Sequence, residues 1–331
     1  MGQLVEGVWH ERAQGATHAG GCSRPDAAFR NWVTPDGRPG PTGHDGFAAA
    51  KGRYHLYVSL ACPWAHQALI MRALKELDEI VSVSVTHWLM NEGGWTFALG
   101  EGVVPDNLFN SHFLHEVYVR ADRTYTGRAT VPILWDRHTQ AIVSNESSDI
   151  ARMFNSSFDG VGAKFGDFYP TELRNEIDAL NIRICDSINC GVFKVGFATT
   201  QQAYDDAVAL LFEALDWLEE RLSHSRFLCG DRITEADIRL FATLVRFDLA
   251  YYGLFKCNLR RIVDYRHLWA YTRDIIQWPN VGQTVDLLHI KRHYYLSHRH
   301  INPMGIVPAG PLIEFDAPSE RGKDIARLLT F

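Results

Sequence analysis

Apolar residues recur at two different spacings within residues 50–150. Short apolar runs bounded by glycine, proline or other turn residues predict strands, whereas recurrence at every third or fourth position predicts helices. A turn-rich insertion at about 88–127 interrupts the series. The order is strand, helix, strand, crossover, strand, hairpin, strand, helix, which indicates an α/β domain. The predicted elements are strands at 53–58, 80–85, 130–136 and 141–143, and helices over about 63–78 and from 144–150 onward.

From about residue 169 the pattern changes to long amphipathic helices with little strand signal. A linker rich in Gly, Ser and Asp, Asn155–Gly166, lies between the two halves. Thr234 and Asp237 form a capping box, a sign that a helix starts there. We therefore divide the chain into an irregular arm at 1–50, an α/β domain at 51–155 and an all-α domain at 168–331. The main helix candidates are Thr171–Ile188, Gln201–Leu222, Thr234–Tyr252 and His267–Trp278.

The order of elements in the first domain is that of a thioredoxin-like fold. In such a domain Pro132, at the start of the third strand, carries a cis peptide bond that brings the preceding backbone beside a nucleophilic cysteine. Taken alone, Pro132 is equally consistent with an ordinary edge-strand proline. The complete order of elements favours the cis proline.

Cys62 lies where the first strand of this domain ends and its first helix begins. Pro63 fits the first helical position, because its ring fixes a helical φ and no amide hydrogen is needed there. A helix N-terminus favours a thiolate and typically lowers a cysteine pKa from about 8.5 to about 3.5–7.5. The alternative is that Cys62 is simply a small buried apolar residue, as free cysteines often are.

Composition narrows the class of protein. The chain has 331 residues, 46% hydrophobic and 22% charged, and a formal net charge of −6, which argues against a general nucleic-acid binder. No apolar run is long enough to cross a membrane, and residues 1–20 lack the apolar core of a signal peptide, so we expect a cytoplasmic protein.

The cysteine spacing indicates single-thiol chemistry. Ala65 stands where a dithiol motif would place the second cysteine, so any disulfide at Cys62 must be resolved by another thiol, most simply one from solution. We expect the thiols to be free, because a reducing compartment prevents disulfides. The six cysteines lie at 22, 62, 185, 190, 229 and 257, without a Cys-x-x-Cys pair or zinc-like spacing.

The two halves together resemble the glutathione transferase superfamily, in which a thioredoxin-like domain precedes an all-helical domain. The capping box that follows Phe227–Asp231 is similar to the helical-domain signature of that superfamily. The finer resemblance is to the glutathionyl-hydroquinone reductases, the xi class, and covers about residues 50–311. The matching motifs are Ser59–His66 with its Cys-Pro-Trp-Ala-His, Gly93–Phe97, Ser144–Ser147, Gly196–Gln201 and the closing block His293–Pro311.

This resemblance implies a glutathione site. Glu146 and Ser147 read as the capped first turn of a helix, and the family adds that they receive the γ-glutamyl end of glutathione. Val131 would offer its backbone to the cysteinyl part, and Arg128 and Trp95 would contact the rest of the tripeptide. On residue chemistry alone, Arg128 is equally consistent with a solvated charge and Trp95 with a loop residue that packs on the domain.

The resemblance also implies a hydroquinone site. Tyr294 and Tyr295 are phenols able to hold quinol oxygens and deliver a proton, and because they are adjacent on a helix at most one faces the thiol. Phe193 departs from the family, which has tyrosine there. We expect no metal site, because His289 and His293, four residues apart, have no third ligand at a recognisable spacing.

The family therefore implies an enzyme that uses glutathione as co-substrate to reduce glutathionyl hydroquinones through a mixed disulfide at Cys62. The alternatives are a conjugating transferase of the same fold and a non-catalytic binding module. A conjugating transferase would need a hydroxyl beside the glutathione thiolate rather than a competing protein thiol. The resemblance also implies a homodimer paired through the helical domain. The net charge and the lack of a long apolar run predict no nucleic-acid or membrane partner.

Overall fold

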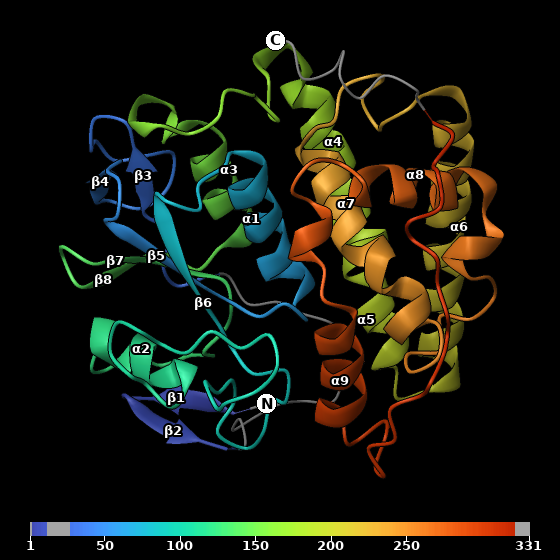
Figure 1. Ribbon diagram of the computed structural model, residues 1–331. Coiled ribbons are helices and arrows are strands. Elements are labelled where there is room, and N and C mark those ends of the chain that lie inside the picture. Colours follow the sequence, from blue (N-terminus) through green and yellow to red (C-terminus); the bar gives the residue numbers. More distant parts are fainter. Residues whose placement is uncertain (1, 12–26, 322–331) are drawn as a thin grey trace. The chain divides into compact units, whose positions relative to one another are not determined.

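In the computed structural model, which describes residues 2–11 and 27–321, four strands form a mixed sheet in the order β6-β5-β7-β8 (Figure 1). The central strand β5 (Tyr54–Val58) is buried at every residue. It pairs in parallel with β6 (Val81–Val85) and antiparallel with β7 (Ile133–Asp136), and β7 pairs antiparallel with β8 (Ala141–Ser144). This topology confirms the predicted thioredoxin-like domain.

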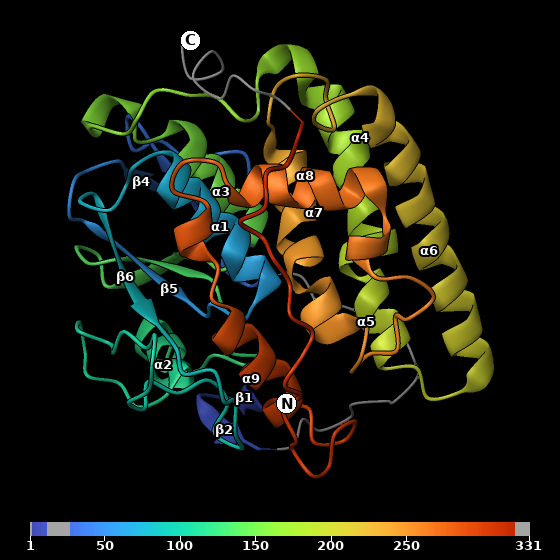
Figure 2. The ribbon, with the colours of Figure 1, turned by 45° about the vertical axis from the view of Figure 1, so that its right-hand side comes forward.

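Helices α1 (Pro63–Leu74) and α3 (Ser147–Ser156) pack against each other beside the sheet (Figures 1 and 2). The sequence predicted that the first helix would continue to residue 78, because Leu77 continues its apolar stripe. The helix ends earlier, since Glu76 adopts a left-handed backbone with φ of 49°. Leu77 is nevertheless fully buried, which explains the misleading periodicity. The insertion contains one helix that the sequence did not predict, α2 (Leu114–Ala121).

In its described residues, 2–11 and 27–50, the N-terminal arm is more regular than the predicted irregular segment. Strands β1 (Gln3–Val5) and β2 (Val8–His10) form a hairpin, and β3 (Trp32–Thr34) pairs in parallel with β4 (Gly46–Ala48). Three-residue strands are too short to show the alternation that predicts a strand. The hairpin is held instead by a backbone bond to a segment distant in sequence, in which the Leu4 N–H donates to the Gly127 carbonyl at 2.8 Å.

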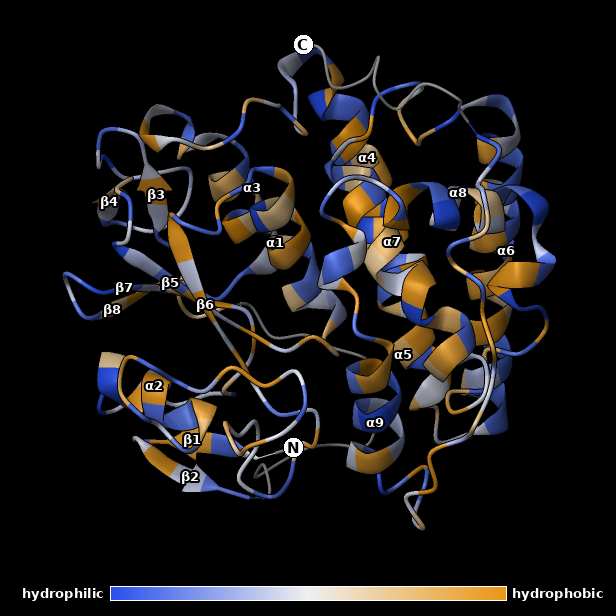
Figure 3. Ribbon diagram, viewed as in Figure 1, coloured by the Kyte–Doolittle hydropathy of each residue, from blue (hydrophilic) through white to orange (hydrophobic). Residues whose placement is uncertain are grey.

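The second compact unit is helical and comprises Gly166–Gln283 with the described residues from His300 onward. Two of the predicted long helices end in π-helical turns, Cys185–Asn189 and Phe247–Tyr251. Helix α7 (Glu235–Arg246) is buried along nearly its whole length, whereas α6 (Gln201–His224) buries one stripe and alternates hydrophobic with hydrophilic residues (Figure 3). Its α-helices are α4 (Arg174–Ile184), α5 (Gly191–Gly196), α6 (Gln201–His224), α7 (Glu235–Arg246) and α8 (Arg266–Ile276).

The predicted capping box lies at the start of α7. The Asp237 carboxylate accepts hydrogen bonds from the Thr234 N–H at 2.8 Å and from its hydroxyl at 2.9 Å. The same carboxylate accepts the Tyr271 hydroxyl at 2.8 Å and the Leu228 N–H at 2.9 Å. These bonds satisfy a carboxylate that is completely buried in the helical unit.

Helix α9 (Leu287–Ser297) differs from the predicted division of the chain, which placed it in an all-helical domain at 168–331. Residues Thr284–Arg299 group with the thioredoxin-like unit instead. The physical reason is a row of bonds from α9 to the insertion at residues 88–101. His289 donates to the Glu101 carbonyl at 2.6 Å, His293 to the Trp88 carbonyl at 2.9 Å, and Ser297 accepts the Met90 N–H at 3.0 Å. Amphipathic periodicity predicts a helix but not the core on which it packs.

Candidate functional site

Cys62 is the N-cap residue of α1. Its backbone is extended, with φ of −77° and ψ of 121°, and its carbonyl accepts the His66 N–H at 3.0 Å as the first bond of the helix. The Cys62 N–H in turn donates to the Ser59 carbonyl at 3.1 Å, which fixes the turn between β5 and α1. The thiol is only half-buried. The predicted placement at a helix start is confirmed.

The thiol faces the backbone that precedes β7. Cys62 Sγ lies 3.9 Å from the Val131 carbonyl oxygen, and the Val131–Pro132 peptide bond is cis, as the order of elements predicted. Val131 itself is 5% exposed, so its side chain anchors the turn while its backbone lies beside the sulfur. The structure thus brings together two of the predicted site residues that are far apart in sequence.

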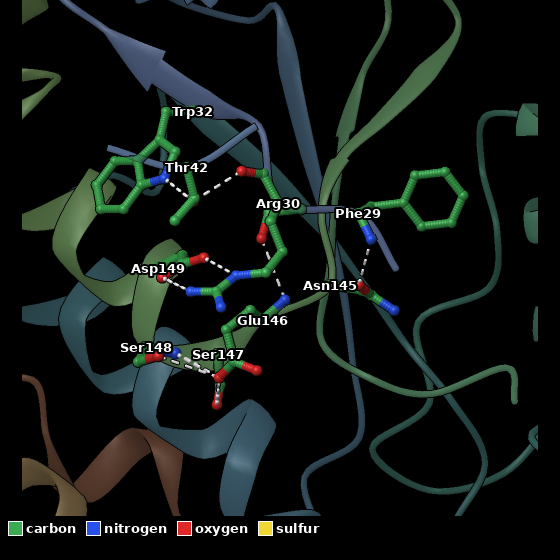
Figure 4. A network of polar contacts seen from close by, with 10 residues as sticks. Phe29, Arg30, Trp32, Thr42, Asn145, Glu146, Ser147, Ser148 and Asp149 are labelled. Atoms are coloured by element: carbon green, nitrogen blue, oxygen red, sulfur yellow. Dashed lines mark hydrogen bonds and ion pairs between the residues drawn. The ribbon is translucent and has the colours of Figure 1, made fainter. Parts of the chain in front are cut away.

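Glu146 and Ser147 form the start of α3 (Figure 4). The Glu146 carboxylate caps the helix by accepting the Ser148 N–H at 3.3 Å and the Ser148 hydroxyl at 3.0 Å. One turn on, Asp149 accepts a two-pronged bond from Arg30 of the N-terminal arm, at 2.7 and 2.8 Å. The predicted capped first turn is therefore present, and the arm holds it in place.

Trp95 lies on a loop of the insertion, and its ring stacks on His293 of α9 with centroids 4.7 Å apart. Gly93 and Gly94 allow this loop to form. A Cβ on Gly93 would lie 2.3 Å from the Phe113 ring, and Gly94 has a left-handed φ of 82°. Trp95 is 7% exposed, so it packs against the unit as the alternative interpretation expected, with its neighbours now identified.

Arg128 is exposed and follows Gly127, the residue bonded to the N-terminal hairpin. Its carbonyl accepts the Tyr125 hydroxyl at 3.2 Å, which fixes the backbone while the guanidinium remains at the surface. Among the described residues its guanidinium forms no ion pair, so the predicted alternative of a solvated charge stays open.

The two tyrosines of α9 differ in burial. Tyr294 is 2% exposed and stacks on His298 with centroids 5.5 Å apart, whereas Tyr295 is half-buried. Both belong to the unit that carries Cys62. The segment before α9 is attached to α1, because Nε2 of the buried His66 lies 2.8 Å from the Thr284 hydroxyl. This bond gives His66 a part in holding the segment.

The other described cysteines lie in the helical unit and are free thiols. Burial raises the pKa of Cys229 to about 11 and also raises that of Cys257. A raised pKa disfavours the nucleophilic thiolate. Cys22 lies outside the described residues.

The sequence did not point to two groups around the candidate site. One is the Arg30–Asp149 pair, and the other is Tyr118 of α2, whose hydroxyl bonds to both Thr130 and Asn145. No local motif marks them, because their partners are distant in sequence.

No helix in the described part of the chain is long and apolar enough to span a membrane.

Both halves of the chain match known protein families. Residues 61–157 match the glutathione S-transferase N-terminal domain, and residues 201–274 match the glutathione S-transferase C-terminal domain. The chain is 53% identical to the glutathionyl-hydroquinone reductase YqjG of Escherichia coli (strain K12) over 98% of this chain and 99% of the relative. It is 51% identical to the glutathionyl-hydroquinone reductase PcpF of Sphingobium chlorophenolicum over 94% of this chain and 96% of the relative.

Solved structures agree with these sequence matches. The glutathione-bound structure of YqjG superposes with a TM-score of 0.91 at 52% identity, covering 98% of this chain and 100% of that one. The xi-class transferase of Natrialba magadii superposes with a TM-score of 0.90 at 42% identity, covering 97% of each chain. The chain therefore belongs to the glutathione transferase superfamily and, within it, to the xi-class glutathionyl-hydroquinone reductases.

Proposed function

We propose that this protein reduces glutathionyl hydroquinones to hydroquinones through a mixed disulfide between Cys62 and glutathione. The observation that carries the proposal is the half-buried thiol at the start of α1, 3.9 Å from the carbonyl that precedes the cis proline. The helix N-terminus favours the thiolate form, which is the nucleophile. The relatives named as reductases of this kind supply the substrate class.

Cys62 acts as a single thiol. Among the described residues it is the only cysteine of the thioredoxin-like unit, and Ala65 occupies the place of a resolving cysteine. The disulfide formed at Cys62 is therefore opened by a second glutathione from solution. Free thiols and a supply of reduced glutathione also fit a cytoplasmic location.

Glutathione binds along the line from Val131 to the start of α3. The Val131 backbone pairs with the cysteinyl part and so places the glutathione sulfur beside Cys62. Glu146 takes the γ-glutamyl ammonium, and Ser147 with the α3 N-terminus takes the carboxylate, because unpaired helix N–H groups favour an anion. Arg128 suits the remaining carboxylate, and Trp95, although packed on His293, has a flat ring and one N–H donor that suit the edge of the tripeptide.

The hydroquinone lies toward α9, where Tyr294 and Tyr295 are the candidate proton donors. One of these phenols holds a quinol oxygen or protonates the ring carbon. The greater exposure of Tyr295 suits substrate contact, whereas the burial of Tyr294 suits a fixed hydroxyl position.

The reaction balances in two exchanges. The Cys62 thiolate attacks the glutathione sulfur of the substrate, the carbon–sulfur bond breaks, and its electron pair goes to the ring carbon, which takes a proton. The keto tautomer of the hydroquinone makes this carbon a stabilised leaving group. A second glutathione thiolate then attacks the glutathione sulfur of the mixed disulfide, which releases glutathione disulfide and restores the Cys62 thiolate.

The test uses glutathionyl menadiol with glutathione, and follows menadiol release and intact protein mass. Wild type is expected to turn over and to carry one glutathione on Cys62, and Cys62→Ala to do neither. Cys185→Ala is the matched control, because Cys185 is also half-buried but lies in the helical unit. This control is expected to match wild type.

Three results would count against the proposal. Undiminished turnover by Cys62→Ala would exclude the mixed disulfide. Addition of glutathione to an electrophile without reductase activity would favour the conjugating transferase. Glutathione binding without either reaction would favour the binding module.

The family resemblance further supports a homodimer formed through the helical unit. Ile182 on α4 is 73% exposed and Leu210 on α6 is 60% exposed, so each offers apolar contact area to a second copy of the chain. Sedimentation of wild type is expected to give twice the chain mass, and Ile182→Glu or Leu210→Glu to lower the association constant. A monomeric wild type would contradict this.

A further inference from the structure

The hydroxyl of Tyr118 joins two turns of the candidate glutathione site. Tyr118 lies on α2 of the insertion and is fully buried. Its hydroxyl donates to the Thr130 carbonyl at 2.9 Å, accepts the Thr130 N–H at 3.2 Å and accepts the Asn145 side-chain amide at 3.1 Å. The Thr130 hydroxyl also lies 3.3 Å from it, so the phenol both donates and accepts in this network.

The two partners stand directly before the residues assigned to glutathione. Thr130 precedes Val131, whose carbonyl faces the Cys62 sulfur, and Asn145 precedes Glu146, the cap of α3. Neither turn is fixed by the sheet, because the β7–β8 pairing ends at Leu134 and Ser144. The spacing between the turns at this open end of the hairpin is instead bridged through Tyr118.

Asn145 is held from its other side by the N-terminal arm (Figure 4). Its N–H donates to the Phe29 carbonyl at 3.1 Å, and its side-chain oxygen accepts the Phe29 N–H at 3.1 Å. Since the side-chain oxygen and nitrogen have different partners, the amide has one defined orientation, with the nitrogen directed to Tyr118. Hydrogen bonds therefore fix both the Thr130 end and the Asn145 end of the bridge through the Tyr118 hydroxyl.

We propose that Tyr118 is a positioning residue for glutathione, which sets the distance between the backbone of Val131 and the carboxylate and hydroxyl of Glu146 and Ser147. This inference rests on the proposed function, which assigns those residues to glutathione. A tripeptide that must meet both turns at once binds well only when their separation is fixed beforehand, because ordering them on binding would reduce affinity.

The test is Tyr118→Phe, which removes only the hydroxyl. The matched control is Tyr271→Phe in the helical unit, where an equally buried hydroxyl donates to Asp237 at 2.8 Å. Both variants are expected to lower the melting temperature. Only Tyr118→Phe is expected to raise the dissociation constant for glutathione, measured by calorimetry on reduced protein, by about fivefold to tenfold, the effect of one net hydrogen bond.

The kinetic readout separates positioning from a general loss of stability. Tyr118→Phe is expected to raise KM for glutathione more than it lowers kcat, whereas Tyr271→Phe leaves both unchanged. Should Tyr118→Phe fail to fold, Asn145→Ser removes the same bridge from the other end and is expected to raise the dissociation constant similarly. In a folded double variant, the two effects should be less than additive.

Two outcomes would overturn the inference. Unchanged glutathione affinity in Tyr118→Phe, or an equal loss in Tyr271→Phe, would show that the hydroxyl only stabilises the fold, while wild-type turnover would leave the proposed function standing. Absence of glutathione binding by wild type would overturn the proposed function and this inference together.

Discussion

Gly196 ends α5 at a point where its α-carbon faces the ring of Phe255. A Cβ at this position would lie 2.3 Å from Cγ of that ring and 2.6 Å from both Cδ atoms. Phe255 is fully buried, and its ring lies against those of Phe193, Phe197 and Tyr251 at centroid distances of 5.6, 5.1 and 5.5 Å. The ring therefore has little room to retreat from an added methyl group.

Two effects oppose each other in Gly196→Ala. Alanine is favoured over glycine in a helix by about 1 kcal/mol, whereas overpacking a core costs about 1–3 kcal/mol. Contacts with three ring atoms place the cost at the upper end, so the free energy of unfolding should fall by about 2 kcal/mol. For a unit of this size, that corresponds to a melting temperature lower by about 4–8 °C.

Urea unfolding followed by circular dichroism measures this change, with Gly191→Ala as the control. Gly191 begins the same helix, but a Cβ there would meet its nearest atom, on Leu211, at an ordinary 3.6 Å. The control should therefore be neutral or stabilised by up to about 1 kcal/mol. The penalty of Gly196→Ala should also shrink in a Phe255→Leu background, where the ring is absent.

A Gly196→Ala variant as stable as wild type, or one that behaves like Gly191→Ala, would refute this reasoning. The result bears on how the xi-class motif at Gly196–Gln201 is interpreted. A large penalty would show that its glycine is required for packing in the helical unit rather than for contact with substrate.

Two further predictions concern the thioredoxin-like unit. His55 is buried between the hydroxyls of Ser82 and Ser84, and burial lowers its pKa to about 4, so only the unfolded chain binds a proton between pH 6.5 and 4. The contribution of His55 to the free energy of unfolding is complete above pH 6.5 and should be about 2 kcal/mol smaller at pH 5. Urea unfolding should show this loss in wild type but not in His55→Gln. Equal losses in the two proteins would contradict the prediction. Arg30→Met leaves the buried Asp149 carboxylate without its two-pronged partner and should lower the free energy of unfolding by about 1.5–3 kcal/mol. The same substitution should cause a smaller drop in the Asp149→Asn background, where no buried charge is left unpaired. Equal stability of Arg30→Met and wild type would show that the pair does not hold the arm.

The sequence predicted those parts of the fold that local chemistry encodes. Cys62 and Pro63 indicate a helix start because a cap and a first-turn proline act within a few residues, and the Thr234–Asp237 box works in the same way. The cis bond at Pro132 followed from the order of elements. Each of these expectations is confirmed.

Interactions across long sequence separations could not be predicted. Periodicity shows that α9 has an apolar face, but the bonds of His289 and His293 to backbone carbonyls near residue 100 decide where that face packs. The π-helical turns also leave no local signal, since the bond from the Cys190 N–H to the Cys185 carbonyl depends on how the surrounding helices pack.

The N-terminal arm is part of the candidate site's support rather than an appendage. Its backbone bonds to Gly127, which precedes Arg128, and to Asn145, which precedes Glu146, and its Arg30 holds the first turn of α3. The bonds from the arm thus end at three residues, Gly127, Asn145 and Asp149. The first two are neighbours of residues that the proposed function assigns to glutathione, and Asp149 lies in the same helix turn as Glu146 and Ser147. Loss of the arm would expose those backbone groups to water and free both turns, whereas the turn at Cys62 is closed by short-range backbone bonds with Ser59 and His66. The position of the thiol is therefore encoded locally, whereas the proposed glutathione site depends on residues that are distant in the chain.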